Sequence, residues 1–458
     1  MITARAFAGR RYCVLGLARS GMASAEALLA SGAQVTAWDR RNEPKERLRG
    51  RATIADPLEI DLRGFDGIVA SPGVPLNTHP LRDKAARAGV PVIGDIELFA
   101  QARAELPPHK VIGVTGTNGK STTVALVHHL LQAAGIPARL GGNIGVPILA
   151  EDPLEPAGDV PGVYVLELSS FQIDLTRSLA CEAAALINIT PDHLDRYDDF
   201  AAYAFAKGRL LAMQGAGQFA VFGCEDAPTS AVQQAEAARR AEGRADCVDA
   251  WAWSAYQKDW PSLQGPHNLQ NAAIAAALVR EMGVTRAQIM DGLASFAGLP
   301  HRMERIGTCK GVLFVNDSKA TNPASTAPAL AAFAPEGGRP RIHWICGGLP
   351  KEDNLRDCAP YYPNVARAYT IGDAGPLFAQ LLDGHVPVER CEMLSEAVRR
   401  AKEMAQDGDV VMLSPACASF DQFRDYEARG QAFRELAVEM GCTDERSPGG
   451  TMTARSIA

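Results

Sequence analysis

The stretch Ile112-Gly-Val-Thr-Gly-Thr-Asn-Gly-Lys120-Ser-Thr122 decides how this chain of 458 residues is built. An apolar strand runs into the glycine-rich loop Gly116–Ser121, and a helix is predicted over Thr122–Ala134. The glycines allow backbone N–H groups to turn inward on an anion, and the start of the helix adds a partial positive charge. In such a loop Lys120 would reach the β- and γ-phosphates of a nucleotide, and the Ser121 hydroxyl would hold Mg²⁺. The stretch therefore predicts nucleotide binding and leaves the reaction open.

The glycines of this loop are not spaced as in the common phosphate-loop pattern G-x-x-x-x-G-K-[ST]. That pattern has a glycine six positions before the lysine, where this chain has Val114. The glycines are Gly113, Gly116 and Gly119 instead. A glycine-rich turn that happens to precede a lysine is therefore the alternative. The order of strand, loop and helix favours the phosphate loop, because all three parts are needed to hold a nucleotide phosphate.

Strands and helices alternate on both sides of the loop, which predicts an α/β fold with mostly parallel sheets covered by helices. A chain of this length is too long for one hydrophobic core. The stretch Leu106–His109, with two prolines, and the stretch Gly298–Arg302 are the expected joins between domains. We expect domains at residues 1–104, 105–299 and 300–442, followed by a flexible tail at residues 443–458.

Short apolar runs bounded by turn residues are expected to form the buried strands of these sheets. They are Arg11–Leu15, Gln34–Trp38 and Gly67–Ala70 in the first domain, Val111–Thr115, Val163–Leu168 and Ala184–Asn188 in the second, and Val312–Asn316, Arg341–Cys346 and Val410–Leu413 in the third. Helices are expected between them, among them Met22–Ala30 and the alanine-rich stretch His267–Met282.

The composition is that of a soluble globular protein, with 47% hydrophobic and 22% charged residues. A net charge of −7 argues against general binding to nucleic acid or to an anionic membrane. No stretch reaches the ~20 apolar residues that span a bilayer. The ten cysteines are scattered and form no C-x-x-C pair. We therefore expect reduced, mostly buried cysteines, no zinc site and a cytoplasmic location.

Polar side chains follow the apolar strands of the second domain, at the strand ends where ligands collect in such sheets. Glu167 ends an apolar strand, where a carboxylate is costly unless a cation pairs with it. A metal ligand and a buried structural carboxylate are the two interpretations. His193 alone is a weak metal candidate, since most lone histidines are only hydrogen-bonded. Asn268 and Asn271 lie near the start of a predicted helix, where they would either cap the helix or bind a base.

These motifs, taken together and in this order, resemble those of the Mur ligase superfamily over about residues 10–435. The matching stretches are Thr115–Thr122, Glu167–Gln172, Asn188–Arg196, His267–Asn271, His301–Glu304, Asn316–Asn322 and Leu413–Phe423. The phosphate loop of that family resembles T-G-T-N-G-K-[ST], which accounts for the spacing of the glycines. The resemblance implies three α/β domains, with a Rossmann-like N-terminal domain, a P-loop NTPase-like central domain and a Rossmann-like C-terminal domain.

The resemblance also implies that the first domain binds the uridine diphosphate of a nucleotide substrate. Its turn Gly16–Gly21 lacks the middle glycine of G-x-G-x-x-G, and a side chain there would obstruct the close approach of a dinucleotide pyrophosphate. The positions that match the substrate contacts of the family are Leu17, Ala18, Asp39, Arg40, Arg41, Ser71, Gly73 and Asn143.

By the same resemblance, the chain would use ATP to join D-glutamate to UDP-N-acetylmuramoyl-L-alanine, in peptidoglycan precursor synthesis. The carboxylate of the nucleotide substrate would attack the γ-phosphate of ATP, and the amine of glutamate would then capture the acyl phosphate. Several anionic groups come together in such a reaction, so metal ions and cationic side chains would supply most of the transition-state stabilisation, and two Mg²⁺ ions are expected. The enzyme is expected to be a monomer.

The family pattern assigns roles to individual positions of this chain. The ATP-binding positions are Gly116, Thr117, Asn118, Gly119, Lys120, Ser121, Thr122, Asn271, Arg302 and Asp317. The metal-binding positions are Ser121, Glu167, His193 and, if it is carbamylated, Lys207. The catalytic positions are Lys120, His193, Lys207 and Lys319, and the glutamate-binding positions are Thr321, Lys351, Ser419 and Tyr426. Without the family, Lys207 would be interpreted as a solvated helix lysine.

Two other functions stay open at this point. A folylpolyglutamate synthase of the same superfamily would have a pterin pocket and no uridine-binding first domain, whereas a whole α/β segment precedes the phosphate loop here. A nucleotide switch of the P-loop class would leave the motifs at Asp317–Lys319 and Ser419 without a role. The choice between D- and L-glutamate also stays open, because it depends on the exact placement of the carboxylate contacts.

Overall fold

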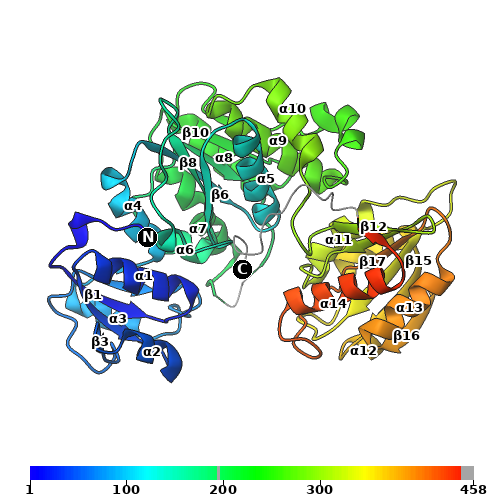
Figure 1. Ribbon diagram of the computed structural model, residues 1–458, viewed down its shortest axis with the longest axis horizontal. Coiled ribbons are helices and arrows are strands. Elements are labelled where there is room, and N and C mark those ends of the chain that lie inside the picture. The colour runs from blue at the N-terminus through cyan, green and yellow to red at the C-terminus, as the bar shows by residue number, and fades with distance from the viewer. Residues whose placement is uncertain (193–195, 445–458) are drawn as a thin grey trace. The chain divides into compact units, whose positions relative to one another are not determined.

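The structure is a computed structural model that describes residues 1–192 and 196–444 (Figure 1). Within these residues the chain forms two compact units. The first contains residues 1–249 and 270–292, and the second contains residues 250–269 and 293–444. In the described part of the chain, no helix has the length and apolar character needed to cross a membrane. The predicted α/β fold is confirmed, since every sheet is mostly parallel and is flanked by helices.

The first sheet has five parallel strands in the order β3-β2-β1-β4-β5. They are β1 (Arg11–Leu15), β2 (Gln34–Trp38), β3 (Thr53–Ile54), β4 (Gly67–Ala70) and β5 (Val92–Ile93), with helices α1 (Arg19–Ala30), α2 (Asn42–Leu48), α3 (Leu81–Ala88) and α4 (Asp95–Ala102). Both faces of β1 are buried, with Tyr12 and Val14 in one apolar cluster and Cys13 and Leu15 in another. The three strands predicted for this domain are confirmed, and α1 begins three residues before the predicted Met22.

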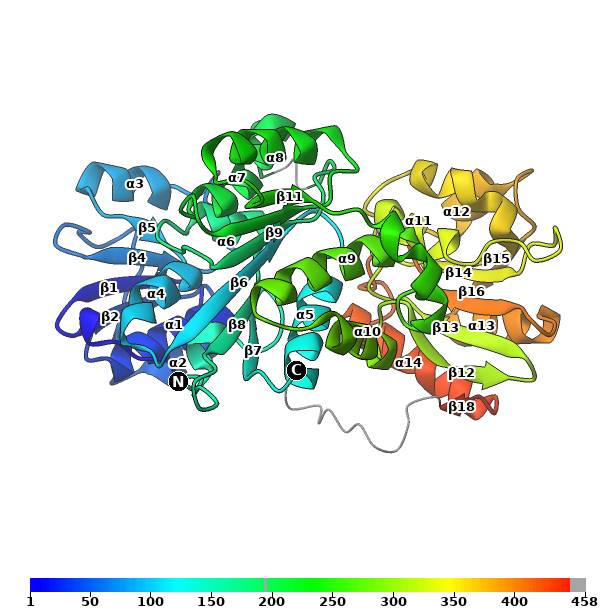
Figure 2. The same ribbon diagram turned by 90° about the horizontal axis from the view of Figure 1, so that it is seen from above.

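The second sheet has six parallel strands in the order β11-β10-β9-β6-β8-β7. They are β6 (His109–Thr115), β7 (Ala138–Gly142), β8 (Gly162–Glu167), β9 (Ala183–Leu186), β10 (Phe219–Phe222) and β11 (Ala245–Cys247). The helices are α5 (Lys120–Ala133), α6 (Ser170–Asp174), α7 (Phe200–Ala212), α8 (Ala227–Arg239), α9 (Pro266–Glu281) and α10 (Arg286–Ser295). Helices α7 and α8 lie on one side of the sheet and α5 on the other (Figure 2). Because β6 lies between β8 and β9, the residues that follow these three strands meet at one edge of the sheet.

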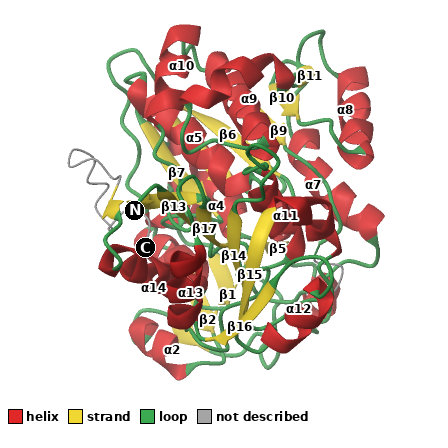
Figure 3. Cartoon of the chain, turned by 90° about the vertical axis from the view of Figure 1, so that its right-hand side faces the viewer, coloured by secondary structure: helices red, strands yellow, loops and turns green. Residues whose placement is uncertain are grey.

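The third sheet has seven strands in the order β16-β15-β14-β17-β13-β12-β18, and all neighbours pair in parallel except β12, which is antiparallel to both β13 and β18. They are β12 (Glu304–Cys309), β13 (Val312–Asn316), β14 (Ile342–Gly347), β15 (Val365–Ile371), β16 (Val388–Glu392), β17 (Val410–Leu413) and β18 (Thr443–Asp444). Helices α13 (Leu394–Met404) and α14 (Tyr426–Glu439) cover one face, and α11 (Pro323–Ala331) and α12 (Gly375–Leu382) cover the other (Figure 3).

The structure differs from the predicted tail at its first two residues. Thr443 and Asp444 form β18, which pairs with β12 through Gly307 and Thr308. The pairing satisfies backbone groups that the edge strand β12 would otherwise present to solvent. A two-residue edge strand has no periodicity, so the sequence gives no local sign of it. Residues 445–458 lie outside the described part of the chain.

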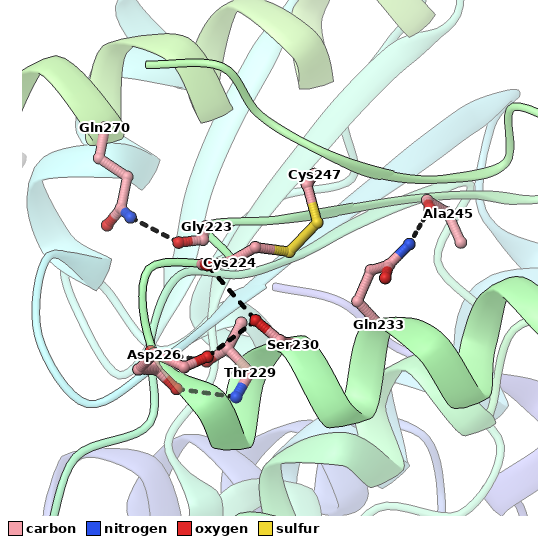
Figure 4. Close-up of a disulfide and its surroundings, with 9 residues drawn as sticks. All are labelled: Gly223, Cys224, Asp226, Thr229, Ser230, Gln233, Ala245, Cys247 and Gln270. Carbon is pink, nitrogen blue, oxygen red and sulfur yellow. Dashed lines mark hydrogen bonds between the residues drawn. A yellow bond between two sulfur atoms is a disulfide. The ribbon is translucent and has the colours of Figure 1, made fainter. Parts of the chain in front are cut away.

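The prediction of ten reduced cysteines is wrong for one pair. Cys224 and Cys247 form a disulfide, and their Cα atoms are 5.7 Å apart (Figure 4). Cys224 follows β10 and Cys247 ends β11, and these strands are parallel neighbours. Helix α8 returns the chain between them, so a separation of 23 residues hides the contact from any local spacing rule. The other eight cysteines are free and buried, as expected.

Candidate active site

The phosphate loop leaves β6 at Thr115 and enters α5 at Lys120. Gly119, directly before the helix, has a left-handed backbone with φ of 85°. A Cβ atom at this position would lie 2.5 Å from Oδ1 of Asn271, so only glycine fits. Asn271 is buried, and its Oδ1 also accepts a hydrogen bond from Thr123 Oγ1 at 3.2 Å. The loop therefore packs closely against Asn271 and presents its backbone at the start of a helix, where anions bind.

Asn188 fixes the backbone of the phosphate loop. Its Oδ1 accepts hydrogen bonds from the N–H groups of Thr117 at 3.1 Å and Asn118 at 2.9 Å. The Thr117 hydroxyl accepts a hydrogen bond from the Thr190 N–H at 3.0 Å and lies 3.2 Å from the Tyr203 hydroxyl. This role of Asn188 was not predicted, although its place in a family motif, two residues after β9, is a signal that could have revealed it.

Two lysines converge on one carbonyl oxygen of the loop. Lys120 Nζ donates to the carbonyl oxygens of Gly116 at 2.9 Å and Thr117 at 2.7 Å, and Lys207 Nζ donates to that of Gly116 at 2.7 Å. Lys207 comes from α7, is 2% exposed and has its Nζ 4.6 Å from the centre of the Tyr203 ring. Burial, and next the charge of Lys120, hold the pKa of Lys207 well below its usual range. The alternative of a solvated helix lysine is therefore wrong.

Glu167 is the last residue of β8 and is 3% exposed. Its Oε1 accepts a hydrogen bond at 3.0 Å from Nδ2 of Asn143, a residue assigned above to the nucleotide substrate. Its Oε2 is buried and has no hydrogen-bond partner among the described residues. A buried carboxylate oxygen without a partner is costly, and a divalent cation would supply the missing interaction.

The structure gives less information on two other residues that are predicted to bind the metal. Ser121 is buried in the first turn of α5, whereas His193 lies outside the described residues. Over residues 1–192 and 196–444, no group of three or more His, Cys, Asp or Glu side chains forms a complete metal site. The residues present fit Mg²⁺ in its usual setting, in which one or two carboxylates share the ion with substrate phosphates and water.

The predicted substrate-binding residues of the first domain lie on the loops that follow β1, β2 and β4. Asp39 Oδ2 accepts a hydrogen bond from the Leu17 N–H at 2.7 Å, and its Oδ1 accepts one from the Arg41 N–H at 2.9 Å. Ser71 Oγ donates to the Gly16 carbonyl at 2.7 Å. Burial alone would raise the pKa of Asp39, but the hydrogen bonds from Leu17 and Arg41 and the charge of Arg41 lower it. The same loops carry Ala18, Arg40 and Gly73.

Arg302, in the second unit, lies between two residues with left-handed backbones, His301 (φ 61°) and Met303 (φ 47°). Such conformations cost residues with side chains about 1–3 kcal/mol and persist only where the surroundings enforce them. The Met303 N–H donates to Asp317 Oδ1 at 3.1 Å, and the Lys319 N–H donates to the His301 carbonyl at 3.0 Å. These bonds hold Arg302 beside the turn that contains Asp317 and Lys319.

Asp317 is buried and is the first residue of the loop that follows β13. Besides the bond from Met303, its Oδ2 accepts a hydrogen bond from Ser414 Oγ at 2.7 Å. Burial raises the pKa of Asp317 to about 7. The carboxyl group is therefore held in place by two neighbours, and burial opposes its ionisation.

Three of the residues predicted to bind glutamate, and Lys319, which is predicted to be catalytic, meet in two pairs. Lys319 Nζ lies 3.7 Å from the centre of the Tyr426 ring, and Lys351 Nζ donates to Thr321 Oγ1 at 3.1 Å. Ser419 is buried, in the loop that follows β17. Two cations thus lie on the loops of this domain, which suits an amino acid with two carboxylates.

The sequence matches three domains of one family, namely the MurD-like N-terminal domain over residues 10–94, the Mur ligase middle domain over residues 114–279 and the Mur ligase glutamate ligase domain over residues 301–417. A UDP-N-acetylmuramoylalanine–D-glutamate ligase of Novosphingobium aromaticivorans is 64% identical over 448 residues, which cover 98% of each chain. The chain belongs to the Mur ligase family. Mur ligases of the same name from Sphingopyxis alaskensis and Zymomonas mobilis are 55% and 52% identical, over 96% and 95% of this chain and 100% and 99% of theirs.

Solved structures of other Mur ligases share the fold at low sequence identity. UDP-N-acetylmuramate–alanine ligase MurC from Thermotoga maritima is 16% identical, with a TM-score of 0.53 over 94% of this chain and 99% of its own. The MurF ligase of Thermotoga maritima, solved in complex with ADP, is 18% identical, with a TM-score of 0.54 over 84% of this chain and 96% of its own. The family and fold predicted from the motifs are thereby confirmed.

Proposed function

We propose that this chain uses ATP to join D-glutamate to the alanyl carboxylate of UDP-N-acetylmuramoyl-L-alanine, in peptidoglycan precursor synthesis. The observation that carries the proposal is the similarity to a UDP-N-acetylmuramoylalanine–D-glutamate ligase, which extends over 98% of the chain at 64% identity. It therefore includes the loops of the first and third domains, which choose the two substrates, as well as the phosphate loop. We expect the enzyme to act as a monomer in the cytoplasm.

The reaction proceeds in two steps, and neither step needs an oxidant or a reductant. A carboxylate oxygen of the nucleotide substrate attacks the γ-phosphorus of ATP, and ADP leaves. The amine of glutamate then attacks the acyl carbon, the tetrahedral intermediate expels inorganic phosphate, and the amine loses a proton. Charge builds up on phosphoryl oxygens in the first step and on an acyl oxygen in the second, so fixed cations stabilise both transition states.

In the first step, the chain supplies the phosphate loop, Lys120 and the carboxylate of Glu167. Lys120, which contacts two carbonyl oxygens of its own loop, would exchange these for the β- and γ-phosphates. Mg²⁺, held by Glu167 and Ser121, would neutralise phosphate charge. Asn271 and Asp317 would contact the base and the ribose, and Arg302 the γ-phosphate, as the family pattern implies.

Lys207 is the group that we expect to carry a carbamate. Carbamylation requires a neutral amine, which adds to CO₂ and releases a proton. Burial and the neighbouring charge of Lys120 favour the neutral form of Lys207. The product would be an anion beside Lys120, and it would become a ligand for a second Mg²⁺ together with His193. At present the cationic side chains of Lys120 and Lys207 both contact the Gly116 carbonyl. Carbamylation would turn them into a cation and an anion that attract each other.

In the second step, the C-terminal domain binds glutamate. Lys319 and Lys351 would face its carboxylates, with Thr321, Ser419 and Tyr426 as further contacts. The folylpolyglutamate synthase alternative loses its support, because residues 10–94 match a MurD-like N-terminal domain. The switch alternative would not explain the match to a glutamate ligase domain over residues 301–417.

A phosphate-release assay tests the proposal. The purified chain is mixed with ATP, Mg²⁺ and UDP-N-acetylmuramoyl-L-alanine, and either D-glutamate, L-glutamate or neither is added. We expect steady phosphate release with D-glutamate and at least 100-fold less with L-glutamate or without an amino acid. If no phosphate is released with either enantiomer, the proposal is contradicted. If ATP is hydrolysed equally fast without the nucleotide substrate and without glutamate, the chain is a nucleotide switch. The variant Lys120→Met serves as the control for contaminating ATPases.

A further inference from the structure

Arg429, on helix α14, is a buried cation to which the predicted mechanism assigns no role. The residue is 1% exposed. Its guanidinium donates four hydrogen bonds: Nε to Ser318 Oγ at 3.0 Å, one terminal nitrogen to the Ala418 carbonyl at 3.1 Å, and the other to the carbonyls of Ser318 at 2.9 Å and Cys417 at 3.0 Å. All four acceptors are uncharged. Among the described residues, no carboxylate forms an ion pair with Arg429.

The acceptors belong to the loops that carry the predicted glutamate-binding residues. Ser318 directly precedes Lys319, and Cys417 and Ala418 directly precede Ser419. The Ser318 hydroxyl, which accepts from Arg429, also donates to the Tyr426 carbonyl at 2.8 Å. One planar guanidinium group therefore ties the Lys319 turn to the Ser419 loop.

A third loop, which carries Lys351, packs against the same group. Gly348 has a φ of 131°, and a Cβ atom there would lie 3.0 Å from a terminal nitrogen of Arg429 and would collide with the Ala418 carbonyl. Two backbone hydrogen bonds of 2.9 and 3.0 Å join Leu349 to Ala418. Arg429 thus lies where all three loops meet.

The chemistry of arginine suits this position better than that of any other residue. Its five N–H donors form a rigid planar fork, which matches several carbonyl oxygens at fixed directions. Burial lowers the pKa of Arg429 to about 10, so the side chain stays charged at neutral pH. A buried cation without an anionic partner is costly, and it is expected where its field or its geometry serves another group.

We propose that Arg429 is a positioning residue for glutamate capture. It holds the turn of Lys319 in register with the loops of Ser419 and Lys351, and its charge adds to the positive field that receives a dicarboxylate amino acid. This inference rests on the proposed function. Asp317 has anchors of its own, Ser414 and Met303, so the ATP contact of the same turn does not depend on Arg429.

The test compares Arg429→Met and Arg429→Lys with the wild type in the phosphate-release assay. We expect Arg429→Met to raise the KM for D-glutamate at least 20-fold, and to leave the KM values for ATP and for the nucleotide substrate within threefold. Arg429→Lys keeps the charge but loses the planar fork, so its KM for D-glutamate should rise at least fivefold and stay below that of Arg429→Met. If the methionine variant does not fold, the lysine variant carries the test.

Arg240 provides a matched control. It is also a buried arginine that makes four hydrogen bonds, to Glu236, Gln218, Leu211 and Gln214, in the central domain. Arg240→Met should lower the melting temperature and leave the KM for D-glutamate within twofold. A role confined to stability would be indicated if Arg429→Met lowered the melting temperature with an unchanged KM for D-glutamate, or raised all three KM values equally. A wild-type KM in Arg429→Lys would also overturn the inference.

The two proposals fail in different ways. A wild type that releases no phosphate with either enantiomer of glutamate contradicts the proposed function. A wild type that uses D-glutamate, together with Arg429 variants whose KM for D-glutamate is unchanged, contradicts only the role of Arg429.

Discussion

The phosphate loop of the central domain and the glutamate loops of the C-terminal domain are assembled in different ways. The phosphate loop is one contiguous stretch, fixed by the glycine at position 119 and by the side chain of Asn188. The loops that carry Lys319, Lys351 and Ser419 come from separate parts of the chain, and Arg429 bonds to Ser318 across 111 residues. Each site relies on a side chain from elsewhere in the chain, but Asn188 fixes one contiguous loop, whereas Arg429 joins loops that come from separate parts of the chain.

The largest effect that tests this contrast is expected at Lys120. Lys120→Met removes the one charged side chain of Gly116–Ser121, which we propose contacts the phosphates, so kcat should fall at least about 1,000-fold. Lys120 also donates to two carbonyl oxygens of the loop, but the bonds from Asn188 and from Lys207 to the same loop stay in place, so the melting temperature should change little. Phosphate release and thermal unfolding check both points. A variant that keeps a tenth of the activity would show that the loop does not bind the reacting phosphates.

The disulfide gives the second effect, on stability alone. The bond between Cys224 and Cys247 closes a loop with a sequence separation of 23 residues, for which chain entropy predicts a stabilisation of about 3 kcal/mol. The double variant Cys224→Ser, Cys247→Ser should therefore unfold at lower denaturant concentration than the oxidised wild type. A reducing agent should lower the stability of the wild type and leave the double variant unchanged. Equal sensitivity of both to the reducing agent would show that the bond does not brace the central domain.

Glu167 provides an intermediate effect on catalysis. Glu167→Gln keeps the shape of the side chain and an oxygen that can accept from Asn143, but it removes the charge that a cation requires. The Mg²⁺ concentration for half-maximal activity should rise about 10- to 100-fold. A titration of activity with Mg²⁺ at saturating ATP measures it. An unchanged Mg²⁺ dependence would assign Glu167 to structure, which is the alternative interpretation of a buried carboxylate.

Asp317 gives the smallest effect, which depends on pH. Its pKa in the folded protein is about 7, whereas an unfolded aspartate titrates near 4. Between these values the folded state keeps a proton that the unfolded state has lost, so this contribution to stability is present at low pH and is lost as pH rises through about 7. Asp317→Asn does not titrate, so its stability relative to the wild type should increase from pH 5 to pH 8, by roughly 2–3 kcal/mol. Denaturant unfolding at both pH values measures the difference, and a constant difference would contradict the raised pKa.

The contrast between the two sites also explains what could be predicted from the sequence. The strands next to the phosphate loop and the loop itself were predicted because apolar runs, glycines and a lysine follow one another locally. The burial of Lys207 against Gly116 depends on how α7 packs, and the disulfide depends on a crossover through α8, so neither has a local pattern. Arg429 lies in an ordinary polar helix sequence, and only the fold shows that its side chain points inward. Family motifs named the residues of the C-terminal site, but not the residue that holds them together.

In the proposed reaction, ATP phosphorylates the carboxylate of the nucleotide substrate, and glutamate then captures the acyl phosphate. The most direct measurement uses UDP-N-acetylmuramoyl-L-alanine with ¹⁸O in its alanyl carboxylate. The chain is incubated with this substrate, ATP, Mg²⁺ and D-glutamate, and the released phosphate is analysed by mass spectrometry. One ¹⁸O atom per phosphate is the predicted result, because the attacking carboxylate oxygen leaves with the phosphate. Phosphate without ¹⁸O, released at the rate of amide formation, would contradict an acyl-phosphate intermediate.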